Sequence, residues 1–121
     1  YLGDVNLLAV FSSENQISSI RPNFNLLEKL PGQGLIISSS GDKYDFVSRY
    51  FCPKFGINED PVTGSAHTTL IPYWSYKLKK NSLHAKQISN RGGVLFCSNE
   101  ENRVLIGGNA VLYMKGEIKM N

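Results

Sequence analysis

The stretch from Thr63 to Lys80 constrains the fold more than any other part of this chain. Apolar side chains recur there every four residues, a spacing that places them on one face of an α-helix. These side chains are Ala66, Leu70, Trp74 and Leu78. Ile71 and Tyr73 widen the apolar band. A band of this width predicts a helix that is largely enclosed by a sheet, with the four side chains in the core.

Strand-like runs precede and follow this helix. They lie at 4–11, 34–40, 44–51, 83–90, 94–98, 103–108 and 109–118, with a hairpin turn at 99–102. A short amphipathic helix is expected over 21–30, ending before Pro31. Strands on both sides of one enclosed helix predict an α+β domain with an antiparallel sheet curled around one central helix. No repeat or linker divides the sequence, so we expect residues 1–121 to form a single domain.

Composition excludes several classes of function. The net charge of +3 is mild, and the lysines near position 80 are not interleaved with aromatic side chains, so we expect no nucleic-acid partner. No apolar run approaches the roughly 20 residues that cross a membrane, so we expect no membrane partner. A mean hydropathy of -0.21 with 41% hydrophobic residues is typical of a soluble globular domain, and we expect a cytoplasmic protein.

Cys52 and Cys97 both lie within apolar, strand-like runs. In a cytoplasmic protein such side chains are expected to be buried free thiols rather than a disulfide. Together with His67 and His84 they lack the short spacing of a metal-binding motif, so we expect no metal.

The segment "NEDPVTGSAHT", residues 58–68, lies where the helix should begin. Asp60 followed by Pro61 is typical of a helix start, and Thr63 is a good helix cap. On this interpretation the segment has only a structural role. Gly64 supports a second interpretation, because without a Cβ it lets a ligand approach its N–H, and the amide of Ser65 would point the same way. A small molecule with a carboxylate fits such a site, with Asp60 beside it.

Other polar residues near this segment are expected to be structural. His67 follows Ser65 by two positions, and side chains two apart on a helix do not face each other. We therefore do not expect a Ser–His nucleophilic pair, and we interpret His67 as bonding a nearby backbone group. Arg91 with the two glycines after it is typical of a bulge or tight turn.

Several motifs also occur together in an order that is specific. "EDPVTGSAH" at 59–67 is followed by "PYW" at 72–74 and by the pattern Q-x-S-x-R-G-G at 87–93. In these motifs, and nearly from end to end, the sequence resembles the C-terminal half of the phenazine-biosynthesis PhzF-like isomerase family. The resemblance implies a diaminopimelate epimerase fold, in which two similar halves each wrap antiparallel sheet around a central helix and the active site lies between them.

The resemblance also implies roles for individual residues. Asp60 would line the substrate site, and Ser65 would bind substrate and handle a proton. The amides of Gly64 and Ser65 would hold the substrate carboxylate. The family's chemistry is a proton shift without a cofactor, and its base is a Glu in the other half of the protein. Glu59 belongs to the C-terminal motif, so it does not inherit the role of that base.

Two classes of function remain open from the sequence. In the first, the chain is half of an isomerase whose partners are a small carboxylate-bearing substrate and the missing N-terminal half. Because the chain starts at Tyr1 rather than Met, we expect a fragment of a longer protein. The resemblance places the base in the other half, so we expect this chain to be inactive alone. The face left bare by that half would be partly apolar, and we expect two copies to pair there as a homodimer. In the second, the chain is a non-catalytic module that binds a small anion or a protein.

Overall fold

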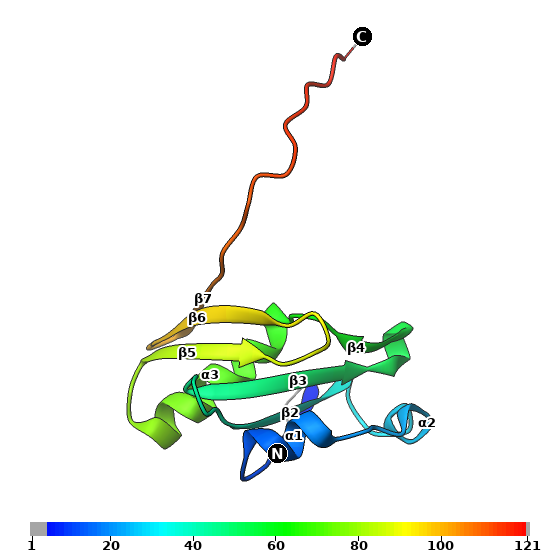
Figure 1. The fold of residues 1–121 in the computed structure, drawn as a ribbon, viewed down its shortest axis with the longest axis vertical. Coiled ribbons are helices and arrows are strands. Elements are labelled where there is room, and N and C mark those ends of the chain that lie inside the picture. Colours follow the sequence, from blue (N-terminus) through cyan, green and yellow to red (C-terminus); the bar gives the residue numbers. More distant parts are fainter. Residues whose placement is uncertain (1–4, 121) are drawn as a thin grey trace.

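The computed structural model describes residues 5–120 and contains one seven-stranded sheet (Figure 1). Its strands are β1 (Asn6–Val10), β2 (Gly34–Ser40), β3 (Phe46–Cys52), β4 (Ile57–Asp60), β5 (Ser82–Gln87), β6 (Gly93–Glu100) and β7 (Arg103–Gly107). The helices are α1 (Glu14–Ser19), α2 (Phe24–Leu27) and α3 (Gly64–Leu78), with a 3₁₀ turn at Pro53–Phe55. Across the sheet the order is β1-β2-β3-β5-β6-β7, and β4 pairs with β3 beside this row.

The sheet is mixed, so the prediction of a purely antiparallel sheet is wrong. Strand β1 pairs parallel to β2, and β3 pairs parallel to β5, whereas the remaining pairs are antiparallel. Each parallel pair is joined by a connection that contains a helix, which returns the chain to the end of the sheet where it began. The α1 segment was not predicted as a helix, and the first of these crossovers was missed with it.

Helix α3 confirms the prediction of a long helix over 63–80 to within two residues at its C-terminus. Thr63 is its N-cap, and Lys79 ends it in the left-handed conformation with φ of 55°. The helix continues through Pro72, whose ring is on the exposed side.

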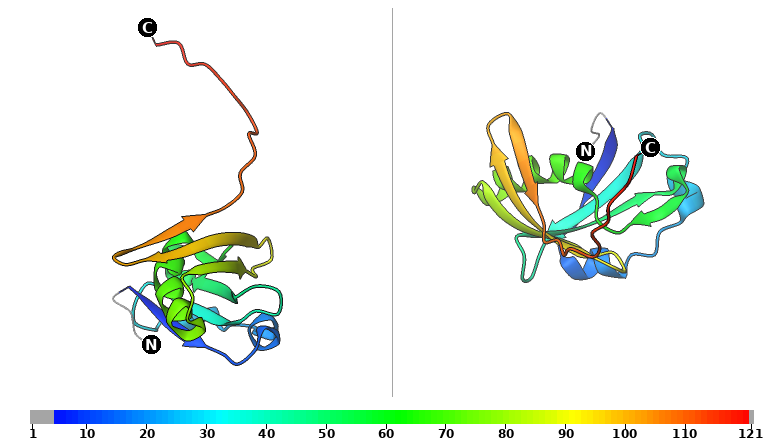
Figure 2. Two further views of the ribbon diagram at one scale, coloured as in Figure 1. Left: turned by 90° about the vertical axis from the view of Figure 1, so that its left-hand side faces the viewer. Right: turned by 90° about the horizontal axis from the view of Figure 1, so that it is seen from above.

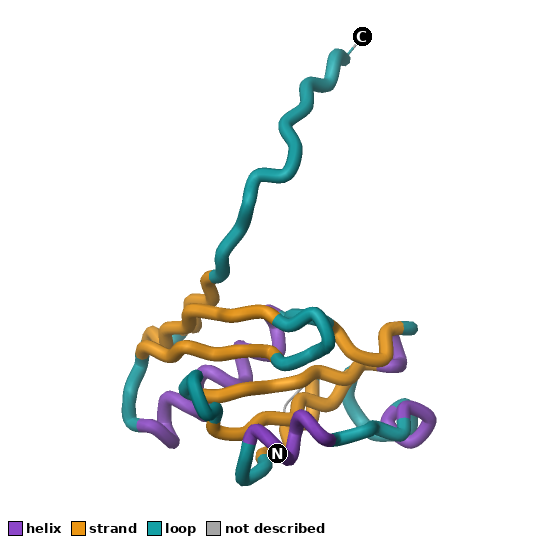
Figure 3. Tube along the Cα trace, viewed as in Figure 1, coloured by secondary structure: helices purple, strands orange, loops and turns teal. Residues whose placement is uncertain are grey.

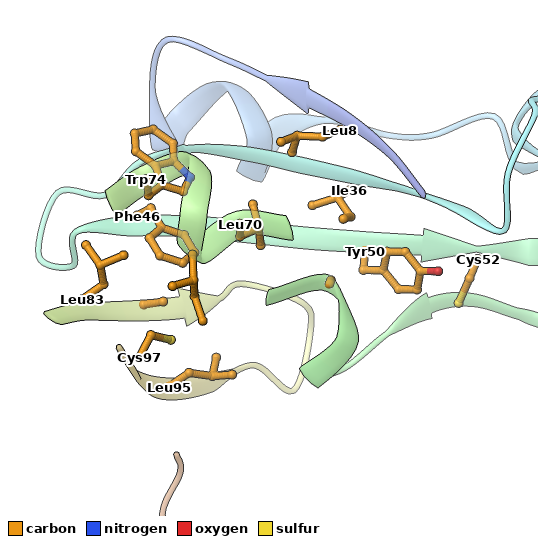
Figure 4. Packing of buried hydrophobic residues seen from close by; sticks show 13 residues of the cluster. Leu8, Ile36, Phe46, Tyr50, Cys52, Leu70, Trp74, Leu83, Leu95 and Cys97 are labelled. Atoms are coloured by element: carbon orange, nitrogen blue, oxygen red, sulfur yellow. The ribbon is translucent and has the colours of Figure 1, made fainter. Parts of the chain in front are cut away.

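The main core lies between α3 and the sheet (Figure 4). Ala66, Leu70 and Trp74 are buried there as predicted, whereas Leu78 is 38% exposed and does not belong to the core. The Trp74 ring stacks on Phe46 with a centroid distance of 5.8 Å, and its Nε1–H donates a hydrogen bond of 2.9 Å to Ser38 Oγ. Leu78 is the last residue of the helix, and the chain turns at Lys79 directly after it.

A second apolar cluster covers the opposite face of the sheet. Its buried members are Ile17, Ile37, Val47 and Phe51. Figure 2 shows α1 and α3 on opposite sides of the sheet. Helix α1 begins at the cap residue Ser13, whose hydroxyl accepts a hydrogen bond from the amide of Gln16. One buried apolar residue in six, Ile17, is too weak a periodic signal to predict this helix.

The prediction of a strand over 109–118 is wrong. Residues 108–120 form neither helix nor strand and lead away from the sheet (Figures 1 and 3). Their large apolar side chains are exposed, including Leu112 at 82% and Tyr113 at 97%. The sequence has a strand-like composition, but within the described residues no neighbouring strand pairs with it.

We predict that Trp74→Ala lowers the free energy of unfolding by about 3–5 kcal/mol, because it removes a buried ring and its hydrogen bond to Ser38. Tyr76→Ala is the matched control on the same helix, since Tyr76 is 86% exposed and should change stability little. The measurement is urea unfolding followed by circular dichroism, because Trp74 is the single tryptophan and fluorescence would be lost. Equal effects of the two substitutions would contradict the packing of α3.

Candidate active site at the start of helix α3

The short strand β4 carries two neighbouring carboxylates to opposite faces of the sheet. Sequence reasoning assigned this segment to a helix start and missed the strand, which ends at Asp60. Side chains alternate along a strand, so Glu59 and Asp60 point to different sides. Four residues after Asp60, α3 begins at Gly64 on the side of the sheet that Asp60 faces. The two carboxylates therefore have different surroundings.

Glu59 forms an ion pair with Arg49 of strand β3. The Arg49 guanidinium donates from Nε and Nη2 to the two carboxylate oxygens, at 2.7 and 2.8 Å. Its Nη1 donates to the backbone carbonyls of Ile17 and Ile20, at 3.0 Å each. This bidentate pair ties β4 to the end of α1 on the face away from α3. Glu59 is thus a structural residue, which agrees with the expectation that it is not the base.

Asp60 faces the α3 side and has polar neighbours of a different kind. Its carboxylate accepts a hydrogen bond from the hydroxyl of Thr63, and it lies opposite Tyr50 in the β3–β4 pairing. Burial raises the pKa of Tyr50 and of Cys52, and the negative charge of Asp60 raises both further. Both groups therefore stay protonated at neutral pH beside the Asp60 carboxylate.

The first turn of α3 is open to an incoming ligand. Thr63 occupies the N-cap position, but its hydroxyl bonds Asp60 and makes no capping bond to the helix amides. Gly64 and Ser65 are exposed, and a Cβ added to Gly64 would meet no atom within 4 Å. Uncapped amides at a helix N-terminus carry a partial positive charge that favours anions. The structure thus brings Asp60, Gly64 and Ser65 together at one exposed turn.

The loop between β5 and β6 completes the surroundings of this turn. A surface cleft of about 430 Å³ lies between them, and its lining includes Gly64, Arg91 and Gly93. Arg91 is exposed, and Gly92 has φ of +69°, which confirms a tight turn. Gly93 packs so closely on Val62 that an added Cβ would lie 2.5 Å from its Cγ2. Arg91 and Gly64 line the same cleft, whereas Asp60 and Ser65 do not line it. A positively charged side chain in a cleft beside a helix N-terminus favours an anionic ligand.

Gln87 was not singled out by sequence reasoning, although it stands first in the Q-x-S-x-R-G-G pattern. It is fully buried at the end of β5 and bonds both Asp60 and Thr63. A buried glutamine is uncommon and requires hydrogen-bond partners, so the burial of Gln87 identifies it once the structure is known. The sequence alone does not reveal that this position is buried.

His67 is structural, as predicted. Its ring is fully buried, and Nδ1 donates a hydrogen bond of 2.7 Å to the carbonyl of Thr63. Burial lowers the pKa of His67, and the bond to Thr63 opposes this shift only in part. Among residues 5–120, His67 Nε2 and Ser48 Oγ are buried side-chain atoms without a hydrogen-bond partner. The ring is therefore neutral and does not face Ser65 as a catalytic base would.

The cysteines are free and buried, as predicted. Burial raises the pKa of Cys97 to about 11, so neither thiol is poised as a nucleophile. The described residues contain no cluster of three or more His, Cys, Asp or Glu side chains that could hold a metal ion. No helix in the same part of the chain is long and apolar enough to cross a membrane.

The fold and this turn define an α+β domain with a carboxylate beside exposed helix amides, an arrangement suited to a small anionic ligand. Comparison with protein families matches residues 2–116 to the phenazine biosynthesis-like proteins. The chain therefore belongs to this family.

The similar proteins are longer than this chain. An uncharacterised isomerase of Pseudomonas aeruginosa is 50% identical over 115 residues, which are 95% of this chain and 44% of that protein. The crystal structure of a PhzF-family protein from Enterococcus faecalis has a TM-score of 0.90 and 51% identity, covering 99% of this chain and 46% of that one. A putative phenazine biosynthesis protein of Clostridium difficile has a TM-score of 0.86 and 49% identity, covering 95% and 45%. The chain thus spans a little under half the length of these relatives.

We predict that acid destabilises the fold in part through His67. Because its pKa is lowered in the folded protein, the unfolded chain binds the proton more readily. The free energy of unfolding should therefore fall as pH decreases through about 6.5, by at most about 1.4 kcal/mol per pH unit for this one group. His67→Asn keeps a donor for the Thr63 carbonyl but does not titrate, so it should reduce this fall.

The measurement is urea unfolding at a series of pH values from 8 to 5. His84→Gln is the matched control, because His84 is exposed and its loss should leave the acid-induced fall in place. An unchanged pH dependence in His67→Asn would show that the buried ring does not cause it.

Proposed function

We propose that this chain is the C-terminal half of a cofactor-independent isomerase that shifts a proton on a small carboxylate-bearing substrate. Membership of a family whose relatives include proteins named isomerases supports this reaction class. In this proposal the sheet and α3 form one half of a diaminopimelate epimerase-like fold. The whole protein works in the cytoplasm, where its thiols stay reduced.

The observation that carries the proposal is the geometry of the turn between β4 and α3. Within six residues it presents the carboxylate of Asp60, the exposed amides of Gly64 and Ser65, and the hydroxyl of Ser65. The amides and the nearby Arg91 would hold a substrate carboxylate, because both carry positive charge. Asp60 would then contact a polar group of the substrate beside the carboxylate.

The proton shift requires a group that removes a proton from carbon and a group that returns one. Ser65 has an exposed hydroxyl that can donate to substrate or relay a proton. Asp60 binds and orients, because its carboxylate already accepts the Thr63 hydroxyl. Glu59 is bound on the other face by Arg49 and cannot reach the turn. The stronger base would therefore come from the N-terminal half, so this chain alone is inactive.

The exposed segment 108–120 supports the proposal of a second half. Large apolar side chains in water are costly, and their exposure along an extended segment is a mark of a protein interface. The E. faecalis protein shares 99% of this chain in fold but has more than twice its length. We therefore infer that the segment pairs with the N-terminal half of the same protein. In isolation, two copies of the chain would pair through the same surface as a homodimer.

The test of activity uses the full-length protein in deuterium oxide. But-3-enoate, a β,γ-unsaturated acid, and L-glutamate, an amino acid, are the two probes, and solvent deuterium on carbon is measured by NMR. We predict incorporation into one of them by the wild type and a loss of about 100-fold in Asp60→Asn, because the substrate would no longer be oriented. Glu59→Gln is the matched control, because it neutralises the adjacent carboxylate on the opposite face.

Glu59→Gln should lower stability by about 1–3 kcal/mol through its weakened bond to Arg49, while it retains the exchange rate. Exchange of neither probe would contradict the proposed reaction, and exchange that survives in Asp60→Asn would contradict the assignment of Asp60. Exchange catalysed by residues 1–121 alone would contradict the need for a second half.

We predict that residues 1–121 bind the separately produced N-terminal half and restore exchange activity on mixing. A chain that ends at residue 108 lacks the exposed apolar segment and should neither bind nor restore activity. Binding is measured by size-exclusion chromatography with light scattering, which also reports any homodimer. Equal binding by the truncated chain would show that the segment is not the interface. Circular dichroism of the truncated chain checks that its fold is intact.

A further inference from the structure

Strand β3 changes its partner partway along its length. Residues 46–48 pair with β5, whereas Tyr50 and Cys52 pair with β4. The two partner strands therefore diverge near Ser48, and β4 pairs with β3 alone. Asp60, the last residue of β4, lies at this divergence, where no strand pairing holds it to β5.

The side chain of Gln87 spans the divergence. Its Nε2 donates hydrogen bonds of 2.7 Å to the Asp60 carbonyl and 3.1 Å to Thr63 Oγ1. Its Oε1 accepts a bond of 2.8 Å from the Thr63 amide. One buried amide thus replaces the missing backbone bonds between the end of β5 and the turn before α3.

The donor and the acceptor of each hydrogen bond can be assigned from the backbone groups that Gln87 contacts. The Thr63 amide can only donate and the Asp60 carbonyl can only accept, so the amide group of Gln87 has one possible orientation. Because Nε2 donates to Thr63 Oγ1, the hydroxyl proton of Thr63 is free to point away from Gln87. That proton is donated to the Asp60 carboxylate. The bonds form a relay from Gln87 through Thr63 to the side chain of Asp60.

We propose that Gln87 is a positioning residue, which acts through the Thr63 hydroxyl to hold the Asp60 carboxylate in its working orientation. The contact of that carboxylate with substrate rests on the function proposed above, whereas the relay itself does not. If Gln87 had only a structural role, its bonds would hold the β4–α3 turn against the loop after β5. Such a role would not require the Thr63 hydroxyl, whereas the positioning role does.

Ser89 provides the matched control, because it joins the same two loops outside the relay. Its hydroxyl donates a bond of 2.7 Å to the Pro61 carbonyl and accepts one of 3.0 Å from the Gly92 amide. Ser89→Ala should loosen the loops without touching Asp60. Gln87→Met keeps the length of the side chain and removes all three bonds, and Thr63→Val keeps the shape of Thr63 and removes its hydroxyl.

The experiment measures the carboxyl ¹³C signal of Asp60 by NMR in the full-length protein, assigned by its loss in Asp60→Asn. The signal should move in Gln87→Met and in Thr63→Val, and it should remain in place in Ser89→Ala and Thr63→Ser. The double variant of Gln87→Met with Thr63→Val should move it no further than Thr63→Val does. If Gln87→Met unfolds, Gln87→Glu is the substitute, because its second oxygen would accept the Thr63 hydroxyl proton and draw it from Asp60.

The second measurement is the exchange rate of the probe that the wild type turns over. Gln87→Met and Thr63→Val should each lower kcat by about tenfold to a hundredfold, and Thr63→Ser should restore it. An unmoved carboxyl signal in Gln87→Met, or one that moves equally in Ser89→Ala, would overturn the proposal. A moved signal with exchange retained in Asp60→Asn would leave the relay standing and overturn the proposed function instead.

Discussion

The packing of helix α3 against the sheet is the interaction on which the rest of the structure depends. Leu70 and Ile71 are fully buried, and Trp74 is stacked on Phe46 and bonded to Ser38 of β2. A helix anchored along most of its length cannot rotate or slide, so its N-terminus is held at one position over the sheet. The amides at that end therefore stay exposed at one place, beside the end of β4.

The two adjacent carboxylates of β4 have different surroundings because of strand geometry. Glu59 and Asp60 differ by one residue, and the alternation of a strand sends them to opposite faces. Arg49 neutralises Glu59 and binds it to α1, which makes that carboxylate part of the scaffold. Asp60 instead accepts the Thr63 hydroxyl on the other face, beside the protonated side chains of Tyr50 and Cys52.

The apolar side chains of residues 108–120, after β7, are exposed in this chain, and the relatives are more than twice as long as the chain. A domain of this size buries about two-thirds of its unfolded surface and has its own core, which this chain has on both faces of the sheet. The segment contributes to neither cluster. Its side chains are suited to burial, and the family relatives have more than half their length outside the region they share with this chain. A second half would provide the surface that buries them.

The local sequence pattern was sufficient to predict one helix, one strand, the family and the candidate site residues. The period of four in the apolar residues predicted α3, and the strand-like run at 34–40 predicted β2 at its observed bounds. The order of three motifs determined the family, because motif order does not depend on packing. The candidate residues Asp60, Gly64 and Ser65 were also named from sequence, since they lie within six positions and need no long-range contact to be neighbours.

Tertiary structure decided everything that depends on residues far apart in the chain. Parallel pairing of β1 with β2 and of β3 with β5 follows from crossover paths, which periodicity does not encode. The strand expected at 109–118 has suitable residues, but no strand among residues 5–120 pairs with it. A strand is stable only when its backbone groups are paired. Gln87 meets Asp60 and Thr63 across 24 to 27 residues, so its role became visible only when the fold brought them together.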